Sequence, residues 1–135
     1  MRRAWTRLGS GLAFTLLSFT SPVRAATLMV APDGLGHYPT LQVAIDAAMP
    51  GDTVLALSGT YSGLGNFDLD FEGKDLSLIG RDGSAFTTID CQHLGRALTL
   101  ESGESKASFF KGFRIANAGT TEINGGAVRC EDAGI

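Results

Sequence analysis

The sequence predicts an all-β solenoid, in which short parallel strands stack turn upon turn, with one helix at its N-terminal end. Three observations lead to this prediction: short apolar runs alternate with polar residues, 18 of the 135 residues are Gly, and apolar pairs recur at a nearly constant spacing. Short strands repeating at about 20–50 residues are typical of solenoids. A composition of 44% hydrophobic and 19% charged residues excludes an intrinsically disordered chain.

Residues 1–25 have the pattern of a secretory signal peptide. A segment with three arginines is followed by the apolar run Leu12–Thr20 and then by a short stretch that ends in Ala25. This order of basic, apolar and small-residue regions is typical of export signals. As a helix the apolar run would reach about 14 Å, which is too short to span a membrane. We therefore expect cleavage after Ala25, a mature chain of residues 26–135 without a transmembrane segment, and a secreted, periplasmic or cell-surface location.

The net charge of −3 hides an acidic mature chain. Four of the eleven basic residues lie in residues 1–25 and none of the fourteen acidic ones does, so residues 26–135 carry seven basic residues and a net charge of −7. Nucleic-acid binding needs clustered Lys and Arg, which excludes this class of partner. The length allows one domain at most.

The first elements of the mature chain are a strand and a helix. Thr27–Ala31 reads as a short strand ended by a Pro-Asp-Gly turn. In residues 40–48, apolar side chains at positions i, i+3, i+4 and i+7 form one helical face, Thr40 is a suitable N-cap, and Pro50-Gly51 ends the helix. The residues of that face are Leu41, Ala44, Ile45 and Ala48. We expect this helix to cap the open N-terminal end of the solenoid core.

The rest of the chain reads as alternating strands in a repeat. The pair Leu55 and Leu57 is followed by a leucine pair at +21 and by another at +22. Because alternate side chains of a strand point to one face, this period predicts that all six leucines point inward and stack as a ladder. The later pairs are Leu76 and Leu78, then Leu98 and Leu100.

Three stretches of the sequence carry motifs of known solenoids. The first, residues 33–61, contains Asp-Gly-x-Gly-x-Tyr-Pro-Thr-Leu-Gln, Pro-Gly-Asp-Thr-Val and Gly-Thr-Tyr, and resembles the opening of right-handed parallel β-helix proteins of the pectin-lyase-like superfamily. Residues 73–92 are similar to further coils of bacterial β-helix repeats, and residues 112–130 to repeats of polymorphic outer-membrane proteins. The resemblance implies a right-handed parallel β-helix of about three coils with an N-terminal capping helix. His37, Leu57-Ser58 and Val128 depart from the usual residues of these motifs.

The resemblance implies architecture more than chemistry. In the enzymes of this superfamily, which include pectate lyases and pectin methylesterases, catalytic residues lie on later coils, and no position here matches them. We therefore expect no catalytic residue in this chain. Because it stops directly after a strand has begun a new coil, we expect the N-terminal part of a longer, truncated β-helix domain. The expected function is structural or binding, in contact with polysaccharide or cell-surface components. The alternative is the N-terminal part of a polysaccharide-active enzyme, similar to a pectate lyase or pectin esterase.

Three carboxylates are weak candidates for a metal site. Asp68, Asp70 and Glu72 alternate with apolar residues, so a strand would place them on one face. Oxygen ligands suit Ca²⁺, but this ion needs six to eight of them from a converging loop. We favour a solvated outer face without a cofactor and keep Ca²⁺ as the alternative.

Cys91 and Cys130 are the two cysteines of the mature chain. Outside the cytoplasm they can form a disulfide, and the other possibility is two small side chains buried between stacked strands. Two cysteines give no framework pattern, so we favour the second. Together with two histidines at unsuitable spacings they also make a poor zinc ligand set.

The remaining polar candidates are basic residues, histidines and one loop. Arg96, Lys111 and Arg114 lie nearest the repeated strands, and we expect ordinary surface charge rather than a site for an acidic polysaccharide. His37 and His93 adjoin turns without an identifiable catalytic partner. The polar stretch 117–126 is either a binding loop or a plain connector.

Overall fold

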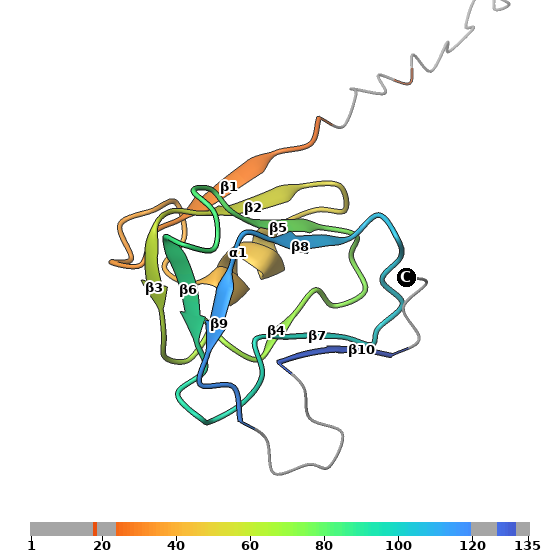
Figure 1. The fold of residues 1–135 in the computed structure, drawn as a ribbon. Helices are drawn as coiled ribbons and strands as arrows, with labels where there is room; N and C mark the ends of the chain where they lie inside the picture. Colours follow the sequence, from red (N-terminus) through yellow and green to blue (C-terminus); the bar gives the residue numbers. More distant parts are fainter. Residues whose placement is uncertain (1–17, 19–23, 120–126, 132–135) are drawn as a thin grey trace, which may run out of the picture.

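The computed structural model describes residue 18, residues 24–119 and residues 127–131. The fold is a parallel β-solenoid of about four turns with one short helix, seen in Figure 1. In chain order the elements are β1 Thr27–Val30, α1 Leu41–Ala47, β2 Thr53–Ala56, β3 Gly59–Tyr61, β4 Leu69–Asp70, β5 Ser77–Gly80, β6 Thr87–Asp90, β7 Leu98–Leu100, β8 Phe109–Lys111, β9 Arg114–Ala116 and β10 Val128–Cys130. The predicted all-β solenoid with one helix is confirmed, with about four turns rather than three.

The strands form three sheets that wall in one core (Figure 1). The first sheet has the order β1-β2-β5-β8, the second β3-β6-β9 and the third β10-β7-β4. Every strand pair is parallel, because each strand is bonded to the equivalent strand of the next turn. The helix α1 follows β1 directly and completes the first turn without a strand in the other two sheets.

The turns differ in length, which shows that the predicted constant period is wrong. In the first sheet Thr53 pairs with Ser77, and Ser77 pairs with Phe109, so the later turn is the longer of the two. Leu98 belongs to the third sheet, where its partner on the preceding turn is Leu69 and not Leu76. Hydrogen bonds between turns set the strand register, whereas the connecting segments at the corners can differ in length from one turn to the next. Leucine pairs at one constant spacing therefore fall on different sheets.

Leu55 and Leu57 were predicted to point into the core, but they do not. In β2 the buried side chains are Val54 and Ala56, and Leu55 is half-buried on the outer face. A shift of one residue in where a strand starts moves every side chain to the other face. The other four leucines of the predicted ladder, Leu76, Leu78, Leu98 and Leu100, are buried.

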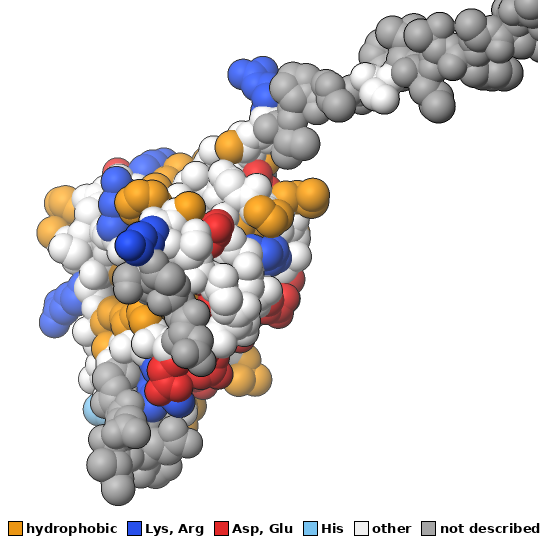
Figure 2. All heavy atoms as spheres, turned by 90° about the vertical axis from the view of Figure 1, so that its right-hand side faces the viewer, with side chains coloured by type: hydrophobic (Ala, Val, Ile, Leu, Met, Phe, Trp, Pro, Cys, Tyr) orange, Lys and Arg blue, Asp and Glu red, His pale blue; other side chains and the backbone are white. Residues whose placement is uncertain are grey.

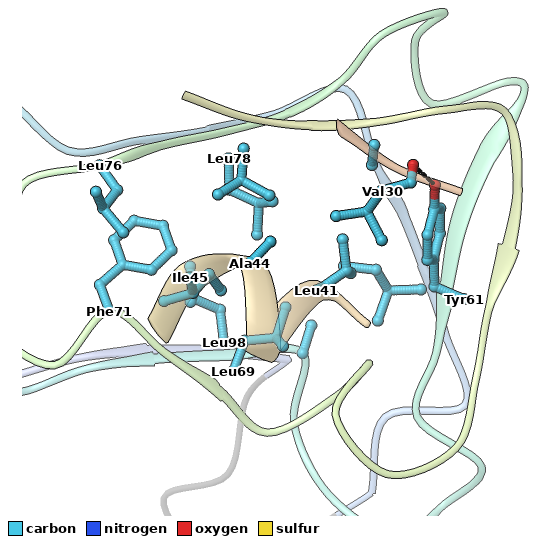
Figure 3. Close-up of a cluster of buried hydrophobic side chains, with 14 of the residues drawn as sticks. Val30, Leu41, Ala44, Ile45, Tyr61, Leu69, Phe71, Leu76, Leu78 and Leu98 are labelled. Carbon is cyan, nitrogen blue, oxygen red and sulfur yellow. Dashed lines mark hydrogen bonds between the residues drawn. The ribbon is translucent and has the colours of Figure 1, made fainter. Parts of the chain in front are cut away.

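The core is a single cluster of stacked inward side chains (Figure 3). Its largest buried members are Tyr61 and Phe71, packed among aliphatic residues of all three sheets and α1. The hydroxyl of Tyr61 is the polar exception, and Figure 3 shows it directed at the carbonyl of Val30, at 2.8 Å. Phe110 and Phe113 stack with ring centroids 5.1 Å apart and extend the cluster into the last turn.

The helix α1 fills the start of the solenoid. The side chain of Thr40 accepts the N–H of Val43, which confirms Thr40 as N-cap. Leu41, Ala44 and Ile45 are fully buried, and the helix contacts β1, β2 and β4. This placement confirms the expected N-terminal cap. None of the helices in the described residues has the length and apolar character needed to cross a membrane.

The loop between β1 and α1 covers part of the free edge of β1. His37 donates its backbone N–H to the carbonyl of Met29 at 2.9 Å, and Tyr38 forms a parallel bridge with Val30. An unpaired strand edge is a template for unwanted pairing. Loop and helix together therefore protect the N-terminal end of the solenoid.

Candidate functional site

The outer side of the second sheet carries a row of polar and aromatic side chains. In β6 Thr87 and Ile89 are buried, so the alternating residues Thr88 and Asp90 face outward. Phe86, in the turn directly before β6, is exposed. The register of the sheet places Thr60 of β3 and Arg114 of β9 on either side of Thr88. We call these five outward residues, Thr60, Phe86, Thr88, Asp90 and Arg114, the binding face. Figure 1 shows its three strands side by side at the left.

Phe86 is the aromatic member of the binding face and is 66% exposed. Its backbone is held firmly, because its carbonyl accepts the N–H of Gly59 at 2.8 Å and its N–H donates to Gly83 at 3.0 Å. The turn thus presents the ring to solvent from a fixed backbone. An exposed aromatic ring on a rigid strand offers apolar contact area at little cost in conformational entropy.

Asp90 supplies a negative charge at the end of β6, two outward positions beyond Phe86 along the chain. Its carboxylate accepts hydrogen bonds from the Asn117 side chain and from the backbone N–H of Gln92, both at 2.9 Å. These two bonds, the Asn117 bond first, hold the pKa of Asp90 below its usual range. Asp90 is therefore ionised at neutral pH and acts as a hydrogen-bond acceptor.

A second polar group lies at the corner that leads into the binding face. The hydroxyl of Ser58 donates to the carboxylate of Asp82, and the Arg81 guanidinium also donates to it at 3.2 Å. The Ser58 bond, with the Arg81 bond second, lowers the pKa of Asp82. This corner is polar and charged, and it borders Phe86 because the carbonyl of Phe86 accepts the N–H of Gly59, the residue after Ser58.

Two further carboxylates serve the corner between the third and first sheets. Asp75 accepts the Ser105 hydroxyl and backbone N–H, each at 2.7 Å, and these bonds lower the pKa of Asp75. The buried Glu104 accepts backbone N–H groups from Gly73 and Ser102, each at 2.9 Å. Both carboxylates bond to loop residues, so we assign them to loop stability. Figure 2 shows this side of the molecule with acidic, basic and hydrophobic side chains interspersed.

The carboxylates Asp68, Asp70 and Glu72 do not share one strand face. The strand β4 covers only Leu69–Asp70, and Asp68 and Glu72 have φ angles of 51° and 55°. Asp68 accepts the backbone N–H of Arg96 at 2.7 Å, and Asp70 accepts that of Glu72 at 2.7 Å. Among the described residues, no group of three or more His, Cys, Asp or Glu side chains is placed to hold a metal ion.

Both cysteines are free thiols in this structure. Cys91 is buried at the corner after β6, and burial raises the pKa of its thiol. Cys130 is exposed at the end of β10 in the third sheet, so the expectation that both cysteines are buried is wrong for Cys130. The two residues lie on different walls of the solenoid.

The other sequence candidates are scattered over the molecule. Arg96 is buried, at 6% exposure, which corrects the expectation that it is a surface charge, whereas Lys111 and Arg114 are exposed on β8 and β9. His37 bonds to β1, and His93 donates its backbone N–H to Asn117 at 2.8 Å. Of the polar stretch 117–126, residues 120–126 lie outside the described residues, as do 1–17 and 19–23 of the expected signal peptide.

Four members of the binding face are not among the candidate residues predicted from the sequence: Thr60, Phe86, Thr88 and Asp90. The signal was present, because residues 86–90 alternate outward and inward around Thr87 and Ile89. Thr60 lies beside Thr88 only because β3 pairs with β6, and the spacing between these two strands is longer than the predicted period.

Comparisons of the chain with protein-family models, with curated proteins and with solved structures give no match.

Proposed function

We propose that this chain is an exported β-solenoid of the right-handed parallel β-helix, pectin-lyase-like type, with a structural or binding role, and that it binds a polysaccharide. Export is supported by the signal pattern of residues 1–25, which precedes β1 directly. The superfamily is supported by the motifs of residues 33–61 together with parallel sheets that begin at β1. Repeats similar to those of polymorphic outer-membrane proteins at residues 112–130 favour a surface protein.

The observation that carries the polysaccharide proposal is the binding face. A sugar ring has an apolar C–H side, which packs on an aromatic ring such as Phe86, and hydroxyls that donate to carboxylates and accept from guanidinium groups. Asp90 and Arg114 supply these polar partners along the polymer, and Thr60 and Thr88, which share one row of the sheet with Arg114, add hydroxyls. Neighbouring strands lie about 4.8 Å apart, so a polymer can cross several turns without leaving the face.

Net charge narrows the class of polysaccharide. The mature chain carries −7, which repels a polyanion. The binding face adds one carboxylate, Asp90, and one guanidinium, Arg114, and so has no excess of positive charge to offset that repulsion. We therefore propose a neutral polysaccharide as the ligand.

The experiment compares two exposed phenylalanines. We expect the mature protein to be retained on at least one of insoluble cellulose, chitin or starch, and not on polygalacturonate. Phe86→Ala is expected to weaken retention about tenfold, because it removes the apolar contact with the sugar ring. Phe109→Ala, which truncates a ring that is 57% exposed on β8, is the matched control and is expected to leave retention unchanged.

Retention on none of the three neutral polymers would contradict the proposal, as would equal losses in both variants. The enzymatic alternative has its own test, the release of unsaturated uronates from polygalacturonate with Ca²⁺ present. We expect no release, and clear activity would replace the binding role with that of a lyase.

A further inference from the structure

The first residue of the solenoid meets a buried carboxylate. The backbone nitrogen of Ala26 donates to Oδ1 of Asp52 at 2.7 Å, and Oδ2 of Asp52 accepts the N–H of Met49 at 2.8 Å. Asp52 is only 5% exposed. The carbonyl of Ala26 accepts the N–H of Thr53 at 2.9 Å, so Ala26 is held through both its nitrogen and its carbonyl.

On the other side of Ala26 the chain leaves the folded body. Arg24 and Ala25 are exposed, and Figure 1 shows the coloured segment directly before β1 leading away from the sheets. The peptide bond between Ala25 and Ala26 therefore lies at the boundary between exposed chain and fold, where a peptidase can reach it. The same bond is the cleavage site that the signal pattern of residues 1–25 predicts.

We propose that cleavage after Ala25 turns the nitrogen of Ala26 into an α-ammonium group that forms an ion pair with Asp52. The proposal rests on the export part of the proposed function. Hydrolysis breaks the bond between the carbonyl carbon of Ala25 and the nitrogen of Ala26. Water supplies the hydroxyl of the new Ala25 carboxyl group and one hydrogen of the amine, and the proton released by that carboxyl group completes the ammonium.

An ammonium group in place of the amide N–H of Ala26 suits the surroundings of Asp52. A buried carboxylate is costly unless it is paired and hydrogen-bonded, and a charged donor makes a stronger bond than a neutral amide. The other charged group at this corner is Lys74, whose ammonium donates to the carbonyls of Ile45 at 2.6 Å and Ala48 at 3.0 Å. The ammonium of Lys74 is thus hydrogen-bonded to carbonyls at the end of α1. The nitrogen of Ala26 is the group that donates to Asp52 and, once charged, would neutralise it.

Backbone bonds from Ala26 and then Met49 lower the pKa of Asp52, so it is ionised at neutral pH. A terminal amine ordinarily titrates near pH 7.7–8.0, and a facing carboxylate raises that value in the folded protein. The ion pair needs an ionised Asp52 and a protonated amine, so its stabilisation is full between about pH 5 and about pH 8 and is lost as the pH rises through the raised pKa of the amine. Among the described residues, Asp52 is the charged group bonded to this nitrogen, and Lys74 acts electrostatically on Asp52.

The test uses proteins with defined N-termini, one starting at Ala26 and one at Ala25. We expect the protein that starts at Ala26 to melt about 4 °C higher at pH 7, because only its amine reaches Asp52. The difference should vanish near pH 10 and also after acetylation of the Ala26 amine. Equal melting temperatures at pH 7, or a difference that survives at pH 10, would overturn the ion pair.

A pair of substitutions assigns the partner. Asp52→Asn keeps one oxygen acceptor for Ala26 but removes the charge, and it should abolish the difference between the two N-termini. Asp46→Asn is the matched control at the exposed side of α1, and it should leave the difference intact. A difference that persists in Asp52→Asn would overturn the assignment, and the comparison of N-termini stands alone if that variant does not fold.

Processing itself is read from the mass of the exported product of the full chain. We expect a product that begins at Ala26. A different first residue overturns the cleavage position. Retention of residues 1–25 overturns both this proposal and the export part of the proposed function. Equal melting temperatures overturn only the ion pair, and loss of polysaccharide binding leaves it untouched.

Discussion

Tyr61 shows at the level of one residue how a polar atom is accommodated in this core. Its side chain is 1% exposed, and its hydroxyl lies 2.8 Å from the carbonyl of Val30 and 2.7 Å from that of Leu57. Burial raises the pKa of Tyr61, against a smaller opposing effect of the Leu57 bond. The hydroxyl thereby links β1 to the corner before β3. No pattern of neighbouring residues in the sequence predicts this link.

Tyr61→Phe is expected to lower the free energy of unfolding by about 1–1.5 kcal/mol, since the ring still fills its site but the buried carbonyls lose their donor. Chemical denaturation measures the loss. Tyr38→Phe is the control, because Tyr38 is only partly buried where it packs against the core. Equal effects in the two variants would contradict the role given to the Tyr61 hydroxyl.

At the scale of the element, α1 is the part of the fold that follows most directly from its own residues. Its N-cap bond joins Thr40 to Val43, and its apolar face repeats with helical spacing. Both features are local, so they can be seen without knowing what the helix packs on. The strands lack this independence, because each is paired only with residues of another turn.

Leu41→Ala is expected to destabilise the protein by about 2–5 kcal/mol, because it opens a cavity where α1 fills the first turn. Val43→Ala, on the side of α1 where the side chain is 42% exposed, should cost under about 1 kcal/mol. Thermal and chemical unfolding of both variants provide the measurement. A small effect of Leu41→Ala would show that the solenoid does not depend on its helical cap.

For the whole molecule, hydrogen-bonded carboxylates couple stability to pH. Hydrogen bonds hold the pKa of each below its usual range, so the unfolded state binds protons first as the pH falls. The stabilisation is therefore present above about pH 5 and is lost as the pH drops through the lowered values. These carboxylates are Asp52, Asp75, Asp82, Asp90 and Glu131.

We expect the melting temperature to be nearly constant between pH 7 and 5 and to fall steeply below pH 4. Thermal melts at constant ionic strength measure this dependence. Asp75→Asn should lower stability at pH 7 and make the fall below pH 4 shallower, because one of the coupled groups is gone. A melting temperature that is unchanged down to pH 3 would contradict the linkage.

The candidate site was predictable only in part. The exposure of Arg114 could be expected from the sequence. Phe86 and Asp90 can be recognised as site residues only once the fold places them near Thr60 and Asn117. The bond from Asn117 to Asp90 joins residues of successive turns, and its existence depends on the length of the intervening chain. Arg96 was expected at the surface and is buried, because the corner it occupies folds against the core.

Local sequence was sufficient for the class of fold, the capping helix and the boundary at which the solenoid begins. Strand alternation, helical spacing and a cap depend on residues within a few positions of one another. Only the tertiary structure decided three other features: the register between turns, the outward position of Leu55 and the contact of Ala26 with Asp52. These features rest on hydrogen bonds between turns, and corners of unequal length allow many alignments that short-range patterns do not distinguish.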